Sequence, residues 1–343
     1  MALLEVRNLR TSFFTDAGEV KAVNGISFDL DHGRVLGIVG ESGSGKSVTA
    51  YSIMQILAST AKIMPGSSIK LDGQELVGAG EKVMKTVRGN KISIIFQDPM
   101  TSLNPTYTIG HQLMEAIMLH TNRTRTQARL RAIEMLRLVN INEPEKRMKQ
   151  YPYEFSGGMR QRIVIAMALA CEPDILIADE PTTALDVTIQ AQILELMNSL
   201  QKELGMAIIM ITHDLGVVAQ MCDEVIVMYA GSICEQGTAD EIFYNPCHEY
   251  TKGLMRSIPT VNDDGAPLQP ITGTPIDLLN MPAGCPFAPR CDAAMKICLR
   301  ERPEHMVIND NHFAGCWMNI KAGVEDGSIT RLEKKGSEGG SEA

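Results

Sequence analysis

The chain has 343 residues and a formal net charge of -9 at pH 7; 44% of its residues are hydrophobic and 21% are charged. These proportions are typical of a globular protein, and the length is sufficient for a sizeable core or two domains. The acidic balance argues against a protein that binds nucleic acid through a basic face. No apolar run approaches the ~20 residues that cross a bilayer, and the chain opens on the strand-like residues 3–6 rather than on a signal peptide. We therefore expect a chain that does not itself span a membrane.

The first motif in chain order is a glycine-rich loop. Residues 40–47 read Gly-Glu-Ser-Gly-Ser-Gly-Lys-Ser and follow the apolar residues 35–39, so they match the GxxxxGK[ST] pattern of a phosphate-binding loop after a strand. Glycines let successive backbone N–H groups point at phosphates, and the next helix directs the positive end of its dipole there. We expect Lys46 to contact the β- and γ-phosphates and Ser47 to ligate magnesium. The predicted nucleotide-binding residues of this segment are Gly40, Ser42, Gly43, Ser44, Gly45, Lys46, Ser47 and Val48.

Two further motifs follow. The apolar residues 175–178 lead into Asp179 and Glu180, which predicts a strand ending in two carboxylates. Asp179 is expected to hold magnesium through water, and Glu180 to orient or deprotonate an attacking water. Upstream, Ser156-Gly157-Gly158 open a helical pattern and predict a second helix N-terminus that can hold phosphate.

This order of motifs resembles the ATP-binding cassette (ABC) family, whose signature usually reads Leu-Ser-Gly-Gly-Gln. Phe155 and Met159 stand at the outer positions of the signature here, outside its Ser-Gly-Gly core. The resemblance implies an α/β fold: a P-loop NTPase cassette with a RecA-like core, an N-terminal antiparallel β subdomain and an α-helical subdomain. It also implies that the chain binds ATP and Mg²⁺ and hydrolyses ATP.

The resemblance assigns roles to further positions. Gln97 would sense magnesium and the attacking water, and His213 would hydrogen-bond the γ-phosphate, so that Glu180, His213 and Gln97 are the expected catalytic residues. Ser47, Gln97 and Asp179 are the expected magnesium ligands. Phe13 occupies about the place where the family stacks an aromatic ring on adenine, with Phe14 as the alternative.

In this family two cassettes meet head to tail. ATP at Lys46 would be closed by the signature of the partner, and Ser156 would close the partner's site. Residues 183–186, Thr-Ala-Leu-Asp, match the loop that crosses to the second cassette, so Asp186 belongs to the expected nucleotide site. The partner can be a second copy or a paralogue.

The motif positions divide the chain. Residues 1–256 are predicted to form the cassette, with a helical subdomain at about 97–153, where apolar residues recur at three- and four-residue steps. In the family this subdomain receives a coupling helix of the membrane subunit. Residues 257–325 are expected to form a C-terminal extension, and residues 326–343 a flexible tail.

The extension narrows the resemblance. Together with residues 96–105, the segment 273–291 is similar to the ATPases of dipeptide and oligopeptide ABC importers, and the likeness covers nearly the whole chain. Four of the eight cysteines crowd into this part, at Cys285, Cys291, Cys298 and Cys316. The other four are scattered through the cassette and are expected to be small buried hydrophobes.

The four clustered cysteines are candidate metal ligands. A disulfide is not expected in a reducing cytoplasm, which leaves metal ligation or coincidence. Four thiolates suit tetrahedral zinc or a [4Fe–4S] cluster, although their spacings lack the CxxC pairs common in zinc sites. The resemblance favours the cluster, in a structural role, with zinc and no metal as the alternatives.

The resemblance implies the ATP-hydrolysing subunit of an importer for dipeptides or oligopeptides, peripheral at the cytoplasmic face of the inner (plasma) membrane. Its expected partners are a second ABC ATPase subunit, two transmembrane permease subunits and an extracytoplasmic substrate-binding protein, without nucleic acid. Importers of nickel and other small solutes use similar subunits. A soluble ABC ATPase acting on nucleic acid or ribosomes is disfavoured, because the chain has neither a second cassette nor a long coiled coil before the signature.

Overall fold

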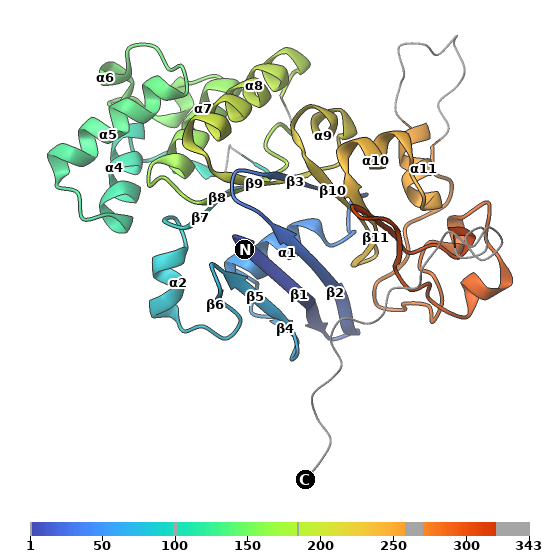
Figure 1. The fold of residues 1–343 in the computed structure, drawn as a ribbon. Helices are drawn as coiled ribbons and strands as arrows, with labels where there is room; N and C mark the ends of the chain where they lie inside the picture. Colours follow the sequence, from blue (N-terminus) through green and yellow to red (C-terminus); the bar gives the residue numbers. More distant parts are fainter. Residues whose placement is uncertain (1, 99–101, 184, 258–269, 320–343) are drawn as a thin grey trace.

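The computed structural model describes residues 2–98, 102–183, 185–257 and 270–319. A small antiparallel sheet of N-terminal strands packs against one face of a larger, mainly parallel sheet, and helices cover the other face (Figure 1). The predicted tail at 326–343, the middle of the segment 96–105 and Ala184 lie outside the described residues.

The antiparallel sheet is built around β1 (Leu4–Thr15). Its other strands are β2 (Gly18–Leu30), β4 (Ala61–Ile63), β5 (Ser68–Leu71) and β6 (Gln74–Glu75). The apolar side chains of β1, such as Leu4, Val6 and Leu9, are buried, whereas polar neighbours face solvent. This sheet therefore has one covered face, as antiparallel sheets commonly do.

The larger sheet has the order β12-β13-β11-β10-β3-β9-β8-β7, and the pairs from β10 to β7 are parallel. Its strands are β3 (Val35–Val39), β7 (Ile92–Ile95), β8 (Ile175–Asp179), β9 (Ala207–Thr212), β10 (Glu224–Tyr229), β11 (Ser232–Thr238), β12 (Met306–Asn309) and β13 (His312–Ala314). Because side chains alternate along a strand, Ile208 and Met210 of β9 join the core under the helices, while Ile209 and Ile211 join the core under the antiparallel sheet. Both faces are covered, which explains why the central strands are apolar throughout.

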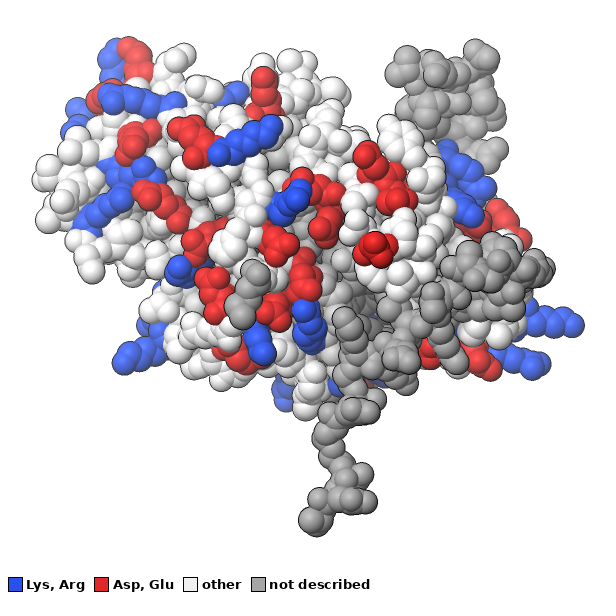
Figure 2. Space-filling model, viewed as in Figure 1, with Lys and Arg blue, Asp and Glu red and all other residues white. Residues whose placement is uncertain are grey.

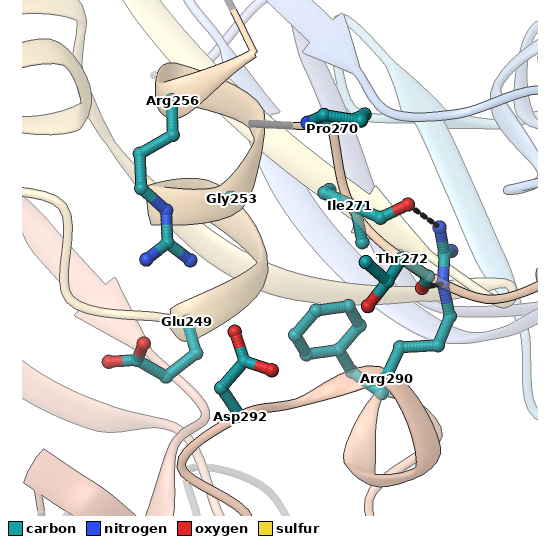
Figure 3. A pocket seen from close by; sticks show the side chains of 9 residues that line it. Glu249, Gly253, Arg256, Pro270, Ile271, Thr272, Arg290 and Asp292 are labelled. Atoms are coloured by element: carbon teal, nitrogen blue, oxygen red, sulfur yellow. Dashed lines mark hydrogen bonds between the residues drawn. The ribbon is translucent and has the colours of Figure 1, made fainter. Parts of the chain in front are cut away.

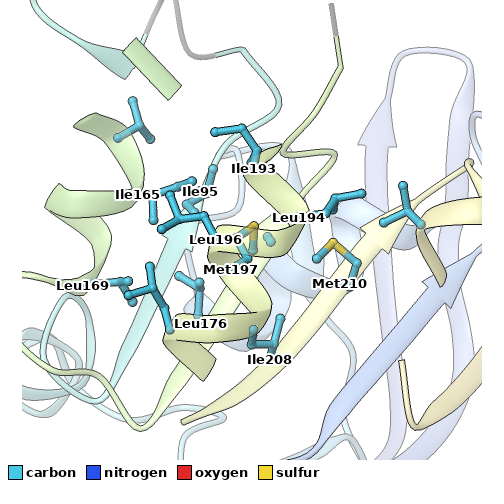
Figure 4. Close-up of a cluster of buried hydrophobic side chains, with 14 of the residues drawn as sticks. Ile95, Ile165, Leu169, Leu176, Ile193, Leu194, Leu196, Met197, Ile208 and Met210 are labelled. Carbon is cyan, nitrogen blue, oxygen red and sulfur yellow. The ribbon is translucent and has the colours of Figure 1, made fainter. Parts of the chain in front are cut away.

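Helices on the two faces complete these cores. The core-facing helices are α1 (Lys46–Met54), α2 (Glu81–Val87), α7 (Gly157–Leu169), α8 (Val187–Leu204) and α9 (Leu215–Met221). Figure 4 shows Ile165 of α7 and Met197 of α8 among the side chains that gather near Leu176 of β8. Full burial of each such side chain stabilises the fold by about 1.5–3 kcal/mol relative to exposure. The P-loop helix α1 lies on the opposite face, where Ala50 and Ile53 are buried.

A group of helices projects at one end of the molecule (Figure 1). It consists of α4 (Ile109–His120), α5 (Arg125–Leu138), α6 (Pro144–Arg147) and the 3₁₀ turn η1 (Pro152–Glu154). Thr124 begins α5 with a capping box that includes Gln127, and Thr108 caps α4. Buried residues of α4 and α5, such as Ile117 and Leu136, belong to the same core as α7.

The C-terminal part continues the larger sheet. After α10 (Ala239–Tyr244) and α11 (Glu249–Arg256), the described chain resumes at residue 270 and contains the turns η2 (Ala288–Arg290) and η3 (Lys296–Leu299) before β12 and β13. β13 pairs antiparallel with β11, so the extension adds two strands to the edge of the cassette sheet. Phe287 is 4% exposed and packs against Tyr229 and Tyr250, with ring centroids 5.4 and 5.2 Å apart. The two strands were not among the elements expected from the sequence of this extension.

Charge is mixed over the face of the molecule that Figure 2 shows. On the face seen in Figure 2, acidic side chains lie between the described Lys and Arg side chains and interrupt any continuous basic area. Among the described residues, no helix combines the length and apolar composition that crossing a bilayer requires.

Candidate nucleotide site and cysteine cluster

The P-loop follows β3 at the carboxyl edge of the parallel strands, where ligands commonly bind in such sheets. Two of its glycines are required by close packing. A Cβ on Gly40 would lie 2.2 Å from the carbonyl oxygen of Met228, and one on Gly45 would lie 2.4 Å from that of Ala22. Both residues also have positive φ, at 151° and 103°. Gly43 has φ 77° but faces open space.

Lys46 folds back over its own loop. Its Nζ donates to the carbonyl oxygens of Gly40 (2.7 Å) and Glu41 (3.0 Å), and the residue is 6% exposed. Burial lowers the pKa of Lys46, and the negative charges of Glu180, Asp179 and Glu41 oppose that shift. The ammonium group therefore lies where α1 begins, facing the acidic end of β8.

Asp179 ends β8 with its side chain held by two hydroxyl groups. Ser47 Oγ donates to Oδ1 (3.0 Å) and Tyr51 Oη donates to Oδ2 (3.1 Å), and Asp179 is 1% exposed. Burial is the largest influence on this carboxyl group and raises its pKa. Sequence analysis did not single out Tyr51, although its place one helical turn after Ser47 puts both on one face of α1.

Glu180 collects three side chains from separate segments. Gln97 Nε2 donates to its Oε2 (2.8 Å), Thr183 Oγ1 donates to the same oxygen (3.0 Å), and His213 Nδ1 lies 3.1 Å from Oε1. Burial alone would raise the pKa of Glu180, but the hydrogen bonds from His213 and Thr183 outweigh it and hold the pKa below its ordinary value. Glu180 also has φ 49°, a left-handed conformation that is rare outside glycine.

The three predicted catalytic residues, Gln97, Glu180 and His213, are thus within hydrogen-bond reach of one another through one carboxylate. An ionised carboxylate in that position can accept a proton from water. Thr183 was known from the sequence only as part of a loop that crosses to a second cassette.

The signature residues lie at the N-terminus of α7. Ser156 caps this helix by accepting the N–H of Met159 and is itself exposed. A Cβ on Gly158 would lie 2.7 Å from Ile189 Cγ2 of α8, so glycine is also needed for helix packing. Asp186 caps α8 by accepting the N–H of Ile189. Here Ser156 and Gly157 present an open helix N-terminus at the surface, a feature that suits an anion.

The aromatic candidates lie side by side on β1 and point to opposite faces, as successive strand residues do. Phe13 is half-buried, whereas Phe14 is 43% exposed with Lys62 Nζ 5.7 Å from its ring centroid. Either ring has free area that a flat base could cover.

The four cysteines of the extension are free thiols in one neighbourhood. Cys285 N–H donates to the carbonyl oxygen of Cys298 (2.7 Å). Burial is the main cause that raises the pKa of Cys285, Cys291 and Cys316, for Cys291 to about 11, and repulsion from other cysteines of the group contributes for Cys285 and Cys291. Each sulfur of the group accepts at least one backbone N–H. Cys285 accepts from Phe287 and Ala288, Cys291 from Ala293, Cys298 from Met295, and Cys316 from Met318, Glu249 and Asn319.

These N–H groups stabilise thiolate, the form that binds metals. Among the described residues, the possible ligands that lie within 4.8 Å of one another in a group of three are Glu235, Cys247 and His312, and the extension cysteines form no such tight trio. The Glu235–His312 pair, at 2.7 Å, is fully buried and ties β13 to β11.

Comparison with known proteins agrees with this geometry. A family model described as "ABC transporter" matches residues 23–183, and one described as "Oligopeptide/dipeptide transporter, C-terminal region" matches residues 234–298. The ATP-binding cassette MJ0796, solved as a dimer in a post-hydrolysis state with ADP and Pi, has a TM-score of 0.61 and 25% identity over 69% of this chain and 98% of its own. The fold and the site together define an ABC-type ATPase, which confirms the predicted cassette fold and ATP hydrolysis.

Full-length relatives place the chain more narrowly. The dipeptide transport ATP-binding protein DppD of Bacillus subtilis (strain 168) is 54% identical over 92% of this chain and 94% of its own length. The oligopeptide transport ATP-binding protein OppD of Salmonella typhimurium is 54% identical over 88% of this chain and 89% of its own. The chain belongs to this family of dipeptide and oligopeptide transport ATP-binding proteins.

Proposed function

We propose that this chain is the ATP-hydrolysing subunit of a multi-subunit importer of dipeptides or oligopeptides. The observation that carries the cargo class is the match of relatives with these names over both the cassette and the extension. The importer would also contain a second cassette, two membrane permease subunits and an extracytoplasmic peptide-binding protein. The chain would be peripheral at the cytoplasmic face of the membrane.

The hydrolytic role of individual residues follows from the site geometry. Lys46 and the loop N–H groups would hold the phosphates, while Ser47, Asp179 and Gln97 would hold Mg²⁺, which neutralises phosphate charge when bound. Glu180, ionised and oriented by His213, would accept the proton of the attacking water. The exposed signature at Ser156 would close the nucleotide of a partner cassette, as in a head-to-tail pair.

The division into parts is also a proposal. Residues 1–256 would form the cassette with its helical subdomain at about 97–153, and residues 257–325 the extension. The helices α4 to α6 support the bounds of the helical subdomain, whereas the β11–β13 pairing joins the extension to the cassette sheet.

Two substitutions test the catalytic assignment. Glu180→Gln is expected to keep ATP binding, lower kcat at least ~100-fold and accumulate a closed dimer, because the base is lost while the phosphate contacts remain. Lys46→Ala is expected to abolish tight ATP binding. ATP turnover and equilibrium binding are measured on both, with Glu195→Gln on the exposed face of α8 as the control. Normal turnover by Glu180→Gln would remove that residue from catalysis.

The importer assignment is tested by purifying the chain from its native membranes and identifying what accompanies it. Two permease subunits and an extracytoplasmic peptide-binding protein are expected. A nickel-binding protein in place of the peptide-binding protein would move the cargo to small solutes. Ribosomal or DNA-repair proteins without a membrane partner would contradict the importer.

For the four cysteines we propose a [4Fe–4S] cluster as the resident group, with a structural role. Sulfurs around one tetrahedral zinc would lie about 3.8 Å apart, from Zn–S distances of about 2.3 Å, and the extension cysteines do not form so tight a group. A cube of four irons holds its thiolates further apart, and the backbone N–H groups aimed at all four sulfurs fit such ligation.

Anaerobic purification tests the cluster directly. The wild-type protein is expected to be brown and to contain iron and sulfide in equal amounts, and Cys291→Ser to lose colour and iron together. Cys171→Ser, in the cassette, is the matched control and is expected to keep both. Stoichiometric zinc in the wild-type protein would contradict the cluster.

A further inference from the structure

One turn of the extension holds the phosphate-binding loop from its outer side. We propose that Arg290, acting through Glu41, positions the P-loop for ATP, so that the ligation state of the flanking cysteines is transmitted to nucleotide affinity. This inference rests on the proposed nucleotide site and adds a positioning residue to it. Arg290 and Glu41 are 249 positions apart in the sequence.

The contact is a bidentate ion pair. Arg290 Nη1 lies 2.5 Å from Glu41 Oε2 and Nη2 lies 3.0 Å from Oε1, and the arginine side chain is 5% exposed. Two carbonyl oxygens fix the guanidinium plane: Nε donates to Thr272 (2.9 Å) and Nη2 to Ile271 (3.3 Å), the second bond being drawn in Figure 3. Such a forked geometry specifies both distance and orientation, which a lysine cannot reproduce.

Glu41 is also tied to the loop that it belongs to. Its N–H donates to Tyr250 Oη of α11 (2.8 Å), and its carbonyl oxygen accepts from Lys46 Nζ (3.0 Å). The preceding Gly40 packs closely against the carbonyl oxygen of Met228 in β10. The side chain of Glu41 therefore connects the backbone that presents Lys46 to the extension, and a shift of Arg290 has a direct route to Lys46.

The other end of this connection is the cysteine site. Arg290 ends η2, whose first residue, Ala288, donates to the carbonyl oxygen of Cys285 (3.0 Å). Cys291 follows at once, and its N–H donates to Ala288 (3.3 Å). Because two candidate ligands flank the turn, binding of the four thiolates to one group would hold Arg290 in place. Beside the turn lies a cavity of about 380 Å³, lined by Asp292, Glu249 and Arg256 among others, which leaves it room to move (Figure 3).

A double-mutant cycle on the full chain tests whether the Arg290–Glu41 pair positions the P-loop for ATP or only attaches the extension to the cassette. Arg290→Gln and Glu41→Gln are each expected to raise the Kd for ATP, measured with EDTA to prevent turnover, about tenfold, with kcat at saturating MgATP within about twofold of wild type. The double variant is expected to be no weaker than either single variant, because both remove one contact. Arg290→Lys is expected to keep the thermal midpoint and still lose most of the affinity, since it keeps the charge without the fork. Arg300→Gln, an exposed arginine of the same extension, is the control.

The effect of the cysteines is measured in the same way, as a change in the Kd for ATP. Cys291→Ser is expected to raise the Kd for ATP in the wild-type background and to have no further effect in the Arg290→Gln background. Equal effects in both backgrounds, or none in either, would overturn the transmission. If Arg290→Gln lowered the thermal midpoint but left the Kd for ATP unchanged, the Arg290–Glu41 pair would only attach the extension to the cassette. That result would overturn the proposal that Arg290 positions the P-loop. If Lys46→Ala kept wild-type affinity, the fault would instead lie in the proposed nucleotide site.

Discussion

At the scale of single residues, the nucleotide loop depends on positions where no side chain fits. Gly45 and Gly43 share positive φ, but only Gly45 has a backbone oxygen, that of Ala22, 2.4 Å from where a Cβ would stand. A contact of this length with main chain forces the backbone to shift. Gly45 is also the N-cap of α1, directly before Lys46, so a shift there moves Lys46.

Paired alanine substitutions isolate this effect. Gly43→Ala is expected to cost about 1–2 kcal/mol of stability from its left-handed conformation alone. Gly45→Ala is expected to cost more, and to weaken ATP binding at least ~10-fold, because steric overlap adds to strain. Chemical unfolding without nucleotide and ATP titration check both quantities. Equal losses for the two variants would show that the overlap with Ala22 is relieved cheaply.

At the scale of elements, α11 begins on a buried histidine. His248 is 3% exposed, and its Nδ1 accepts the N–H of Tyr250 (3.0 Å), so it caps α11. Tyr250 of this helix also accepts the N–H of Glu41 through its hydroxyl oxygen. Burial lowers the pKa of His248 to about 4, from an ordinary value of about 6.5. A proton on Nδ1 would turn the acceptor into a donor and break the cap.

This burial predicts a pH dependence of stability. Between about pH 6.5 and pH 4 the unfolded chain binds a proton at His248 that the folded chain does not, so the unfolding free energy falls as pH falls through that window, by on the order of 3 kcal/mol. Urea unfolding from pH 4.5 to 7.5 measures the slope. His248→Asn, which keeps a capping acceptor, is expected to flatten it. His32→Asn, at an exposed position, should leave the slope unchanged.

At the scale of the whole molecule, cassette and extension share one sheet. β13 of the extension pairs with the edge strand β11 of the cassette. Phe287 of the extension packs against the rings of Tyr229 and Tyr250, and His312 pairs with Glu235 of the cassette. Removal of the extension would leave a strand edge and apolar rings in water. The extension is therefore part of the fold of the cassette.

Two truncations test this dependence. A chain ending at residue 257 is expected to aggregate and to lose several kcal/mol of stability, because unpaired edges template association and Glu235 loses its buried partner. A chain ending at residue 325 keeps every contact described here and is the control. Light scattering and thermal unfolding distinguish them. A monomeric 257-residue chain with normal stability would show that the extension is an independent unit.

What the sequence could reveal depended on how local each signal is. The P-loop and the signature are short runs whose residue types suit phosphate binding, and the Asp179–Glu180 strand end is a short run of carboxylates that suits magnesium and water. The chain order of these motifs indicated the cassette. Contacts between distant segments left no such mark. β12 and β13 have four and three residues, too few for a periodic pattern, and the pairing of β13 with β11 joins residues that are almost 80 positions apart, such as Glu235 and Ala314. Arg290 and Glu41 looked like ordinary charged residues until the fold brought them together.

The backbone of Glu180 has a further consequence for how this protein can change. Its left-handed conformation, φ 49°, carries a strain of roughly 1 kcal/mol that glycine would not bear. Glycine at this position would therefore be favoured by backbone conformation, yet it would remove the carboxylate on which Gln97, Thr183 and His213 converge. Because three hydrogen bonds to a carboxylate are together worth more than this strain, replacement by glycine is expected to lower the stability of the fold as well as to remove the carboxylate, and the strained backbone is kept at this position.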